Sequence, residues 1–169
     1  MNRLAQLLYR LKGTEGFSLL ELSIVMGVTA ILFTIVTINL VKVQRTSTVS
    51  AQVQTLLSDI KQQQLKAMVG ATEGRAANDT YGIYIQSTKY TLFHGMIYTS
   101  SDSSNFPIPL DLAITLATTF PNGLLIFSRQ SGEVVSWTSG KNTITLTNTS
   151  GTEQKTLTIN RYGVVTGIQ

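Results

Sequence analysis

Three residues near the start of the 169-residue chain have types and spacing that could do chemistry. Gly16, Phe17 and Glu21 stand where a short basic segment, residues 1–16, meets a long apolar run. Residues 17–41 make up this run of 25 residues, and Glu21 is its single formal charge. A carboxylate in apolar surroundings is costly and needs a partner. The pattern therefore predicts a long apolar helix that brings one carboxylate to a partner.

The elements that position these residues follow from length and charge. A helix of 25 residues is roughly 37 Å long, and a bilayer core is roughly 30 Å thick. Residues 17–41 are therefore expected to span a membrane. Arg3, Arg10 and Lys12 precede the run and Lys42 follows it, so basic flanks alone leave the orientation open.

The stretch KGTEGFSLLELSIV joins a basic leader, a glycine, an aromatic residue and a glutamate at the fifth place after the glycine. It resembles the prepilin signature of type IV pilins and of the pseudopilins of type II secretion. The resemblance implies that a prepilin peptidase cuts between Gly16 and Phe17, on the cytoplasmic face, and that the new amine is methylated. It also implies that Glu21 neutralises the N-terminal amine of a neighbouring subunit during filament assembly. The backbone of Gly16, free of a side chain, suits an extended substrate.

The same resemblance implies a localisation. It places the leader in the cytoplasm and the C-terminal domain outside, as in a single-pass membrane protein that later enters a surface or periplasmic filament. A plain membrane anchor is the alternative, in which Glu21 reaches up to the lipid headgroups.

Beyond the run, residues 42–69 show helical spacing with one apolar face. Val49, Val53, Leu56 and Ile60 step by four, three and four. Leu57, Leu65 and Met68 are expected to widen this stripe. No proline interrupts residues 17–69, so one continuous helix is predicted, ending at Gly70.

After a loop at residues 70–80 the apolar period changes to two, which is typical of strands. Strands are predicted at 81–86, 90–95, 143–147, 155–160 and 162–168, an edge or irregular strand at 112–120, and a hairpin over 124–137. Residues 96–100 are expected to extend the second strand, and residues 101–109 to form a loop, because Pro107 and Pro109 exclude a central strand.

The predicted fold class is α+β: a long N-terminal helix, with a membrane half and an amphipathic half, packed on a mainly antiparallel sheet, as in pilins. The predicted domains are a leader (1–16), a transmembrane or filament-core helix (17–41), its amphipathic continuation (42–70) and a β-rich domain (71–169). SDIKQQQLKAM, IFSRQSGEVV and the strand after Tyr162-Gly163 resemble the H-type minor pseudopilins.

The residue inventory argues against an enzyme. The chain has no cysteine and one histidine, His94, so thiolate and multi-histidine metal sites are excluded and a structural histidine is favoured. Asp102 and Asp111 flank a polar loop, but their spacing matches no calcium loop. No cofactor, metal or catalytic residue is predicted.

The predicted function is that of a structural, minor subunit of a type IV pilus or pseudopilus, polymerising through its N-terminal helix. The expected partners are a prepilin peptidase, other pilin or pseudopilin subunits, the membrane and an assembly platform protein. One alternative is a DNA-binding minor pilin, if Arg129, Lys141, Lys155 and Arg161 converge. Residues 17–169 carry ten basic and eight acidic residues, so nucleic acid is not the favoured partner. The other alternative is a membrane-anchored surface protein that never polymerises.

Overall fold

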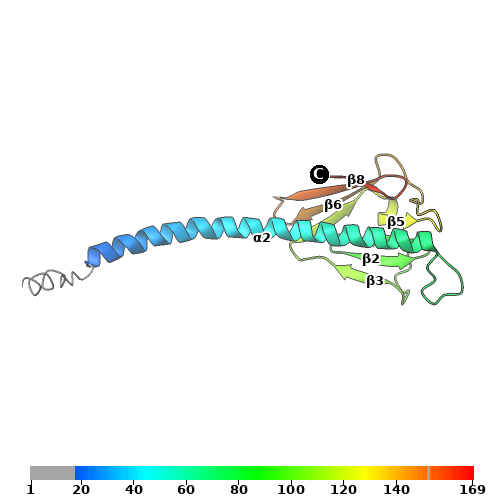
Figure 1. The fold of residues 1–169 in the computed structure, drawn as a ribbon, viewed down its shortest axis with the longest axis horizontal. Helices are drawn as coiled ribbons and strands as arrows, with labels where there is room; N and C mark the ends of the chain where they lie inside the picture. The colour runs from blue at the N-terminus through cyan, green and yellow to red at the C-terminus, as the bar shows by residue number, and fades with distance from the viewer. Residues whose placement is uncertain (1–17, 152) are drawn as a thin grey trace, which may run out of the picture. The chain divides into compact units, whose positions relative to one another are not determined.

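A computed structural model of the chain describes residues 18–151 and 153–169, apart from the side chains of residues 35–48. The chain divides into two compact units, Met1–Lys42 and Val43–Gln169. One helix, α2 (Leu19–Val69), contributes residues to both units (Figure 1). Each unit is therefore described by itself.

The end of α2 has a clear local cause. Gly70 adopts a left-handed conformation with φ of 66°. Its N–H donates to the carbonyl of Ala67, at 3.4 Å, and the N–H of Ala71 donates to the carbonyl of Lys66, at 3.0 Å. This pair of bonds is the Schellman arrangement that ends many helices at a glycine. The prediction that the helix ends at Gly70 is confirmed.

The rest of the second unit forms two four-stranded antiparallel sheets and a short 3-10 helix, η1 (Pro121–Gly123). The first sheet has the order β3-β2-β1-β5 and the second the order β4-β6-β7-β8. The strands are β1 (Tyr81–Ile85), β2 (Lys89–His94), β3 (Phe106–Pro109), β4 (Ile114–Thr118), β5 (Leu124–Phe127), β6 (Thr143–Asn148), β7 (Gln154–Ile159) and β8 (Val165–Ile168).

The two sheets share one core with the C-terminal part of α2. In Figure 1 this part of the helix runs alongside strands of both sheets. Val49, Val53, Leu56 and Ile60 are buried, as the helical spacing predicts, and they belong to one cluster with the inward side chains of both sheets. Leu65 and Met68 are about half exposed, so the prediction that they widen the stripe is wrong.

The stripe continues along a different set of residues. Steps of three and four residues from Ile60 lead to Gln63 and Ala67, and both are buried. A glutamine therefore occupies a position in the apolar stripe. Leu65 and Met68 lie off this line and remain exposed because the helix presents only one face to the sheets.

The predicted fold class is contradicted, and so is the predicted localisation. Within the residues whose side chains are described, the helix comprises the runs 19–34 and 49–69, and no helix there is long and apolar enough to span a membrane. The strands form two sheets, where one was predicted. Of the predicted span 17–41, residue 17 and the side chains of 35–41 lie outside the described residues.

Several strand predictions are confirmed, two are wrong and one is confirmed in part. β1, β2, β6, β7 and β8 lie within or close to the predicted ranges, and β4 is an edge strand as expected. Residues 96–100 form no strand. The predicted loop at 101–109 contains β3, and only the first arm of the predicted 124–137 hairpin forms a strand, β5.

The differences at 101–109 and 124–137 follow from how these segments pair with their neighbours. β3 pairs with β2 at the sheet edge, where Pro107 and Pro109 occupy alternate positions. The residues between them can bond to β2 while the prolines leave the outer edge short of N–H donors. After β5, Val134 forms an isolated bridge with Phe127 and donates its N–H to the carbonyl of Arg161. The chain does reverse around Gln130–Gly132 as predicted, since the Ser128 N–H donates to the Glu133 carbonyl and the Val135 N–H to the Ile126 carbonyl. The second arm forms only this short pairing and no regular strand.

Candidate functional site

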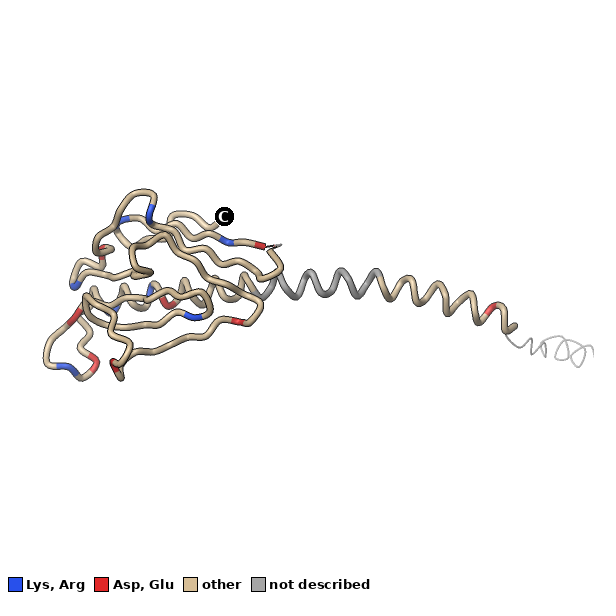
Figure 2. The backbone as a smooth tube through the Cα atoms, turned by 180° about the vertical axis from the view of Figure 1, so that it is seen from behind, with Lys and Arg blue, Asp and Glu red and all other residues tan. Residues whose placement is uncertain are grey.

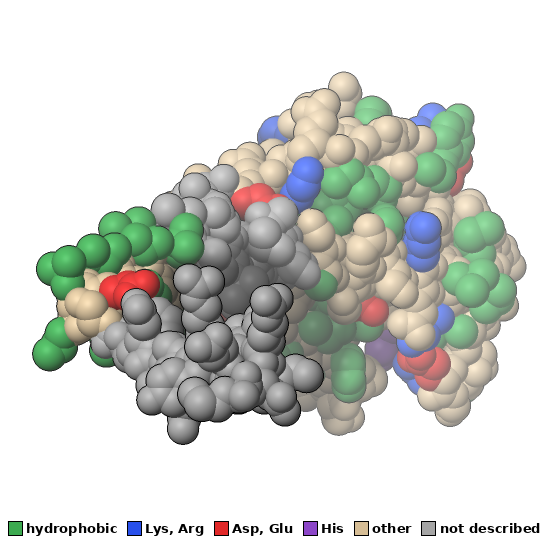
Figure 3. Space-filling model, turned by 60° about the vertical axis from the view of Figure 1, so that its left-hand side comes forward, with side chains coloured by type: hydrophobic (Ala, Val, Ile, Leu, Met, Phe, Trp, Pro, Cys, Tyr) green, Lys and Arg blue, Asp and Glu red, His purple; other side chains and the backbone are tan. Residues whose placement is uncertain are grey.

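Residues 19–34 of α2, here called the apolar segment, form the first candidate site. Ten large apolar side chains between Leu19 and Phe33 are 51–87% exposed. Figure 3 shows hydrophobic side chains beside a single acidic one at the left end of the view. A surface this apolar marks a place of interaction. Because the apolar residues occur on every side of the helix, the segment resembles a buried helix more than a surface helix.

The hydroxyl side chains of the apolar segment bond to the backbone of their own helix. Ser23 Oγ donates to the carbonyl of Leu20 at 2.7 Å, and Thr29 Oγ1 donates to the carbonyl of Val25 at 2.7 Å. Thr34 donates in the same way to the carbonyl of Ala30. Such back-bonding consumes the donor of each hydroxyl inside the helix. The segment therefore presents little free polarity to a partner.

Glu21 is the exception. It is the only charged residue of the apolar segment, and Figure 2 shows this lone acidic position on the tube. No described residue forms a hydrogen bond or ion pair with its carboxylate. Glu21 lies in the first turn of α2, where the helix dipole favours negative charge. The helix thus tolerates the carboxylate there and leaves it available.

Ser18 fixes where this helix begins. Its Oγ accepts a hydrogen bond from the N–H of Leu20, at 3.2 Å, and its carbonyl accepts one from the N–H of Leu22, at 3.0 Å. Serine is a preferred N-cap because its side chain satisfies an otherwise unpaired helical N–H. The other two predicted site residues, Gly16 and Phe17, lie outside the described residues. The structure therefore places only Glu21 of the three.

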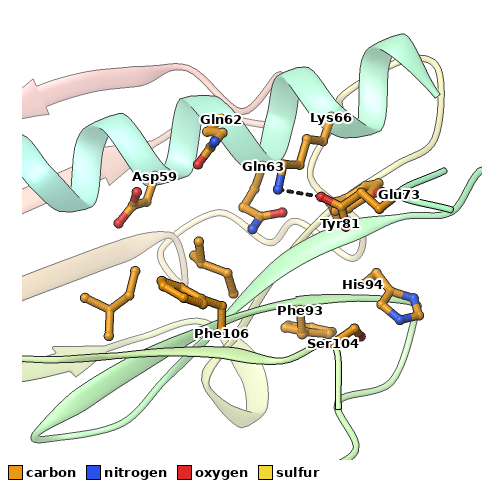
Figure 4. Close-up of a pocket in the computed structure, with 12 residues that line it drawn as sticks. Asp59, Gln62, Gln63, Lys66, Glu73, Tyr81, Phe93, His94, Ser104 and Phe106 are labelled. Carbon is orange, nitrogen blue, oxygen red and sulfur yellow. Dashed lines mark ion pairs between the residues drawn. The ribbon is translucent and has the colours of Figure 1, made fainter. Parts of the chain in front are cut away.

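A second candidate site, which the sequence analysis missed, lies under the C-terminal part of α2. A pocket of about 370 Å³ opens between the helix, the start of β1, and strands β2 and β3 (Figure 4). Asp59, Gln63 and Lys66 line its helical wall, and Leu92, Phe106 and Ile108 belong to its strand wall. We call it the α2–β3 pocket. A glutamine in the apolar stripe was the one sequence signal that could have indicated it.

The polar groups of the α2–β3 pocket are satisfied to different degrees. Lys66 Nζ lies 2.7 Å from Glu73 Oε1. The hydrogen bond and charge of Lys66 hold the pKa of Glu73 below its ordinary value, against a smaller effect of burial. Tyr90 donates its hydroxyl to Asp59 Oδ2 at 2.5 Å. Burial, together with the Asp59 carboxylate, raises the pKa of Tyr90.

His94 stands at the rim of the pocket and has a structural surrounding. Its Nδ1 lies 3.0 Å from Asp79 Oδ2, and its Nε2 lies 3.4 Å from Asp102 Oδ2. Burial raises the pKa of Asp79, but the hydrogen bonds to His94 and to the Thr80 N–H outweigh it, so that the pKa lies below its ordinary value. Hydrogen bonds from Ser104 hold the pKa of Asp102 low. His94 thus joins two loops, at residues 79 and 102.

Two of the four basic residues considered for nucleic-acid binding, Arg129 and Arg161, contact other side chains of the second unit. Arg129 Nη1 donates to Asn78 Oδ1 at 3.1 Å, and Arg161 Nη2 lies 3.6 Å from Glu133 Oε2. Lys155 lies in β7 and Lys141 in the loop before β6. No hydrogen bond or ion pair within the described part of the chain brings the four together. The structure offers no specific observation in favour of a nucleic-acid interface.

Comparison with protein-family models, curated proteins and solved structures finds no match to this chain.

Proposed function

We propose that the chain is a structural, minor subunit of a type IV pilus or pseudopilus filament that polymerises through its N-terminal helix. In this proposal a prepilin peptidase removes residues 1–16, and Glu21 pairs with the methylated amine of Phe17 of a neighbouring subunit. The observation that carries it is the apolar segment, an exposed helix whose hydroxyls are bonded internally and whose single carboxylate has no partner among the described residues.

The apolar side chains provide the driving force for assembly. Burying one large apolar side chain stabilises an association by about 1.5–3 kcal/mol. The apolar segment exposes ten of them, on all sides. A helix that is apolar all round can be surrounded by several neighbouring helices at once, which suits a filament core better than a two-chain interface.

The carboxylate provides the register. Once neighbouring helices enclose Glu21, an unpaired charge there would cost several kcal/mol. The favoured packing of neighbouring subunits is therefore the one that places a cation beside Glu21. The amine released by a cut before Phe17 is such a cation, and it lies four residues from Glu21 in the sequence. Pairing between neighbours then fixes the axial offset of one subunit relative to the next.

The minor-subunit assignment and the expected partners rest on the sequence resemblance alone. These partners are a prepilin peptidase, other pilin or pseudopilin subunits and an assembly platform protein. The proposal assigns no catalytic residue and no cofactor. Neither a DNA-binding role nor a non-polymerising role gains a specific observation from the structure.

The test has a processing arm and an assembly arm, carried out in cells that produce a prepilin peptidase and the filament machinery. Mass spectrometry of the purified protein is expected to show a chain that begins at Phe17 and carries one added methyl group. The variant Glu21→Ala is expected to be processed but to enter filaments at least tenfold less than wild type, because an unmatched amine is left among the helices. The loss is scored by immunoblotting of sheared filaments.

Ser23→Ala is the matched control. It also removes a polar side chain from the apolar segment, but one that bonds only to its own helix. It is expected to assemble like wild type. A chain that keeps residues 1–16 beside an active peptidase, or a Glu21→Ala variant that assembles as well as Ser23→Ala, would contradict the proposal.

A further inference from the structure

We propose that His94 is a proton-dependent clip that holds the loop between β2 and β3, residues 95–105, against the first sheet. The loop is closed while both ring nitrogens of His94 carry a proton, and it opens when one of these protons is lost. The clip lies wholly within the unit Val43–Gln169, so this inference is independent of the proposed filament. It rests on the contacts of the two ring nitrogens and on the aromatic surface that the loop covers.

Each ring nitrogen of His94 faces a carboxylate, and the two carboxylates come from different loops. Nδ1 lies 3.0 Å from Asp79 Oδ2, and Nε2 lies 3.4 Å from Asp102 Oδ2. Figure 4 shows His94 at the end of its strand. A neutral imidazole has one N–H donor and one lone pair, whereas the imidazolium ion has two donors. Only the imidazolium ion can therefore donate to both carboxylates at once.

The contact with Asp102 is the one that depends on the second proton. Asp79 is held in place, because its Oδ1 accepts the N–H of Thr80 at 2.8 Å and the Thr80 carbonyl accepts the N–H of Gly95 at 2.9 Å. A fixed carboxylate beside Nδ1 selects the ring form that keeps its proton on Nδ1. Loss of the Nε2 proton then leaves a lone pair facing the Asp102 carboxylate, and attraction is replaced by repulsion.

The other charged or titratable groups around His94 are Asp79, Asp102, Arg75, Tyr81, Lys66 and Glu73. Carboxylates, phenols, lysines and arginines ordinarily keep one charge state between about pH 5 and about pH 8. Hydrogen bonds from Ser104, with smaller effects of the His94 and Arg75 charges, hold the pKa of Asp102 below its ordinary value. Burial raises the pKa of Tyr81. His94 is the single histidine of the chain, and histidine is the side chain whose charge ordinarily changes in this range.

The loop covers aromatic side chains of the first sheet. Tyr98 of the loop stacks on Tyr84 of β1, with ring centroids 4.2 Å apart, and meets the ring of Phe93 edge-on at 5.5 Å. Side chains alternate along a strand, so Phe93 and Leu92 lie on opposite faces of the sheet. Leu92 belongs to the core shared with α2, whereas Phe93 is buried outside that core. Opening of the loop therefore uncovers Phe93 and Tyr84.

The loop is built to move as one piece. Within the described part of the chain, the hydrogen bonds of residues 96–105 join loop residues to one another. Asp102 accepts both the N–H and the hydroxyl of Ser104, and its own N–H donates to the carbonyl of Thr99 at 3.1 Å. Tyr98 and Asp102 are thus the two points at which the loop is attached, one by ring contact and one by charge.

The direction of the pH dependence follows from these contacts. Closure of the loop requires a protonated His94 and an ionised Asp102. The closed loop is therefore favoured at mildly acidic pH and is lost as pH rises through the titration of His94. It is also lost in strong acid, below about pH 4, where the Asp102 carboxylate takes up a proton.

Hydrogen exchange measured by mass spectrometry reports the opening of the loop. The full chain, kept in detergent that covers the apolar segment, is compared at about pH 5.5 and about pH 8 after correction for the intrinsic exchange rate. Protection of residues 96–105 is expected to be about threefold or more higher at the lower pH. Strands β6 and β7 of the second sheet are expected to be equally protected at both. Equal protection of the loop at the two pH values would overturn the proposal.

Asp102→Asn tests the second contact. The asparagine still offers Oδ1 to the N–H of Ser104, but its amide donates to the bare Nε2 of a neutral His94, so the pH dependence is expected to vanish. Asp111→Asn is the matched control, because Asp111 Oδ1 accepts the N–H of Ala113 in the same kind of turn. It is expected to keep the wild-type pH dependence. If Asp102→Asn also keeps it, Asp102 is not held by His94 and the proposal fails.

His94→Gln removes the only histidine of the chain. A glutamine keeps one donor and one acceptor at every pH, so protection of the loop is expected to be equal at the two pH values. Unchanged protection of β6 and β7 shows that the variant is folded. A pH dependence of loop protection that survives in His94→Gln would belong to another group and would refute the clip.

Discussion

The two ends of α2 belong to one helix but use their side chains in opposite ways. In the apolar segment, 19–34, large apolar side chains are exposed on every side and the only charge has no described partner. In residues 49–69 the apolar side chains form one narrow buried stripe, and Asp59 and Lys66 have partners in the second unit. The first end exposes its apolar side chains, and the second end is part of the core of the second unit.

This contrast shows that apolar content and burial are separate properties. Among the described residues, the more apolar end of the helix is the more exposed one. The less apolar end is buried on one face because two sheets lie against it. The difference predicts that the same kind of substitution affects folding at one end and association at the other.

The largest effect is expected from truncating the buried stripe. Leu56 is fully buried, and Leu56→Ala is expected to lower the free energy of unfolding of the second unit by about 2–5 kcal/mol, through lost burial and a residual cavity. Leu22 is about half exposed, and Leu22→Ala should change that free energy by less than about 0.5 kcal/mol. Urea denaturation measures both. Equal losses would mean that the two ends are not distinct.

A smaller effect is expected from the glycine that ends the helix. Gly70→Ala should destabilise the second unit by about 1–2 kcal/mol, since an L-residue is disfavoured at its positive φ of 66°. A Cβ there would also lie 2.9 Å from Asn78 Nδ2. Gly27 has open space around it within α2, so Gly27→Ala should favour the helix. Thermal unfolding followed by circular dichroism distinguishes the two, and a Gly70→Ala variant as stable as wild type would contradict the Schellman cap.

The smallest effect is expected from acid. The folded-state pKa values of Glu73 and Asp79 lie below their ordinary values. The stability that these carboxylates contribute is therefore present above their unfolded pKa values, near 4, and is lost as pH falls through the lower folded values. Lowering the pH from 6 to 3 should reduce the melting temperature, and Glu73→Gln should make this reduction smaller. An unchanged slope in Glu73→Gln would show that its pair with Lys66 contributes nothing.

Much of the second unit was predictable because its signals are local. The period-two segments at 81–86 and 143–147 correspond to β1 and β6, and the stripe from Val49 to Ile60 faces the core. The predicted loop at 101–109 was wrong because Pro107 and Pro109 exclude only a central strand, and β3 lies at a sheet edge where prolines are tolerated. The hairpin over 124–137 was predicted correctly in its turn but not in its second strand, because Val134 also bonds to Arg161, a residue distant in sequence.

The sequence by itself determined where the helix ends, which residues carry the strand periodicity, and that Glu21 is the only charge in the apolar segment. Periodicity, glycine conformation and charge are properties of neighbouring residues, so they can be read along the chain. Only the tertiary structure decided that the strands divide into two sheets, that α2 leaves β3 partly uncovered, and that Gln63 is buried beside Asp59 and Phe106. These outcomes depend on which distant surfaces meet, and burial is defined only once they have met.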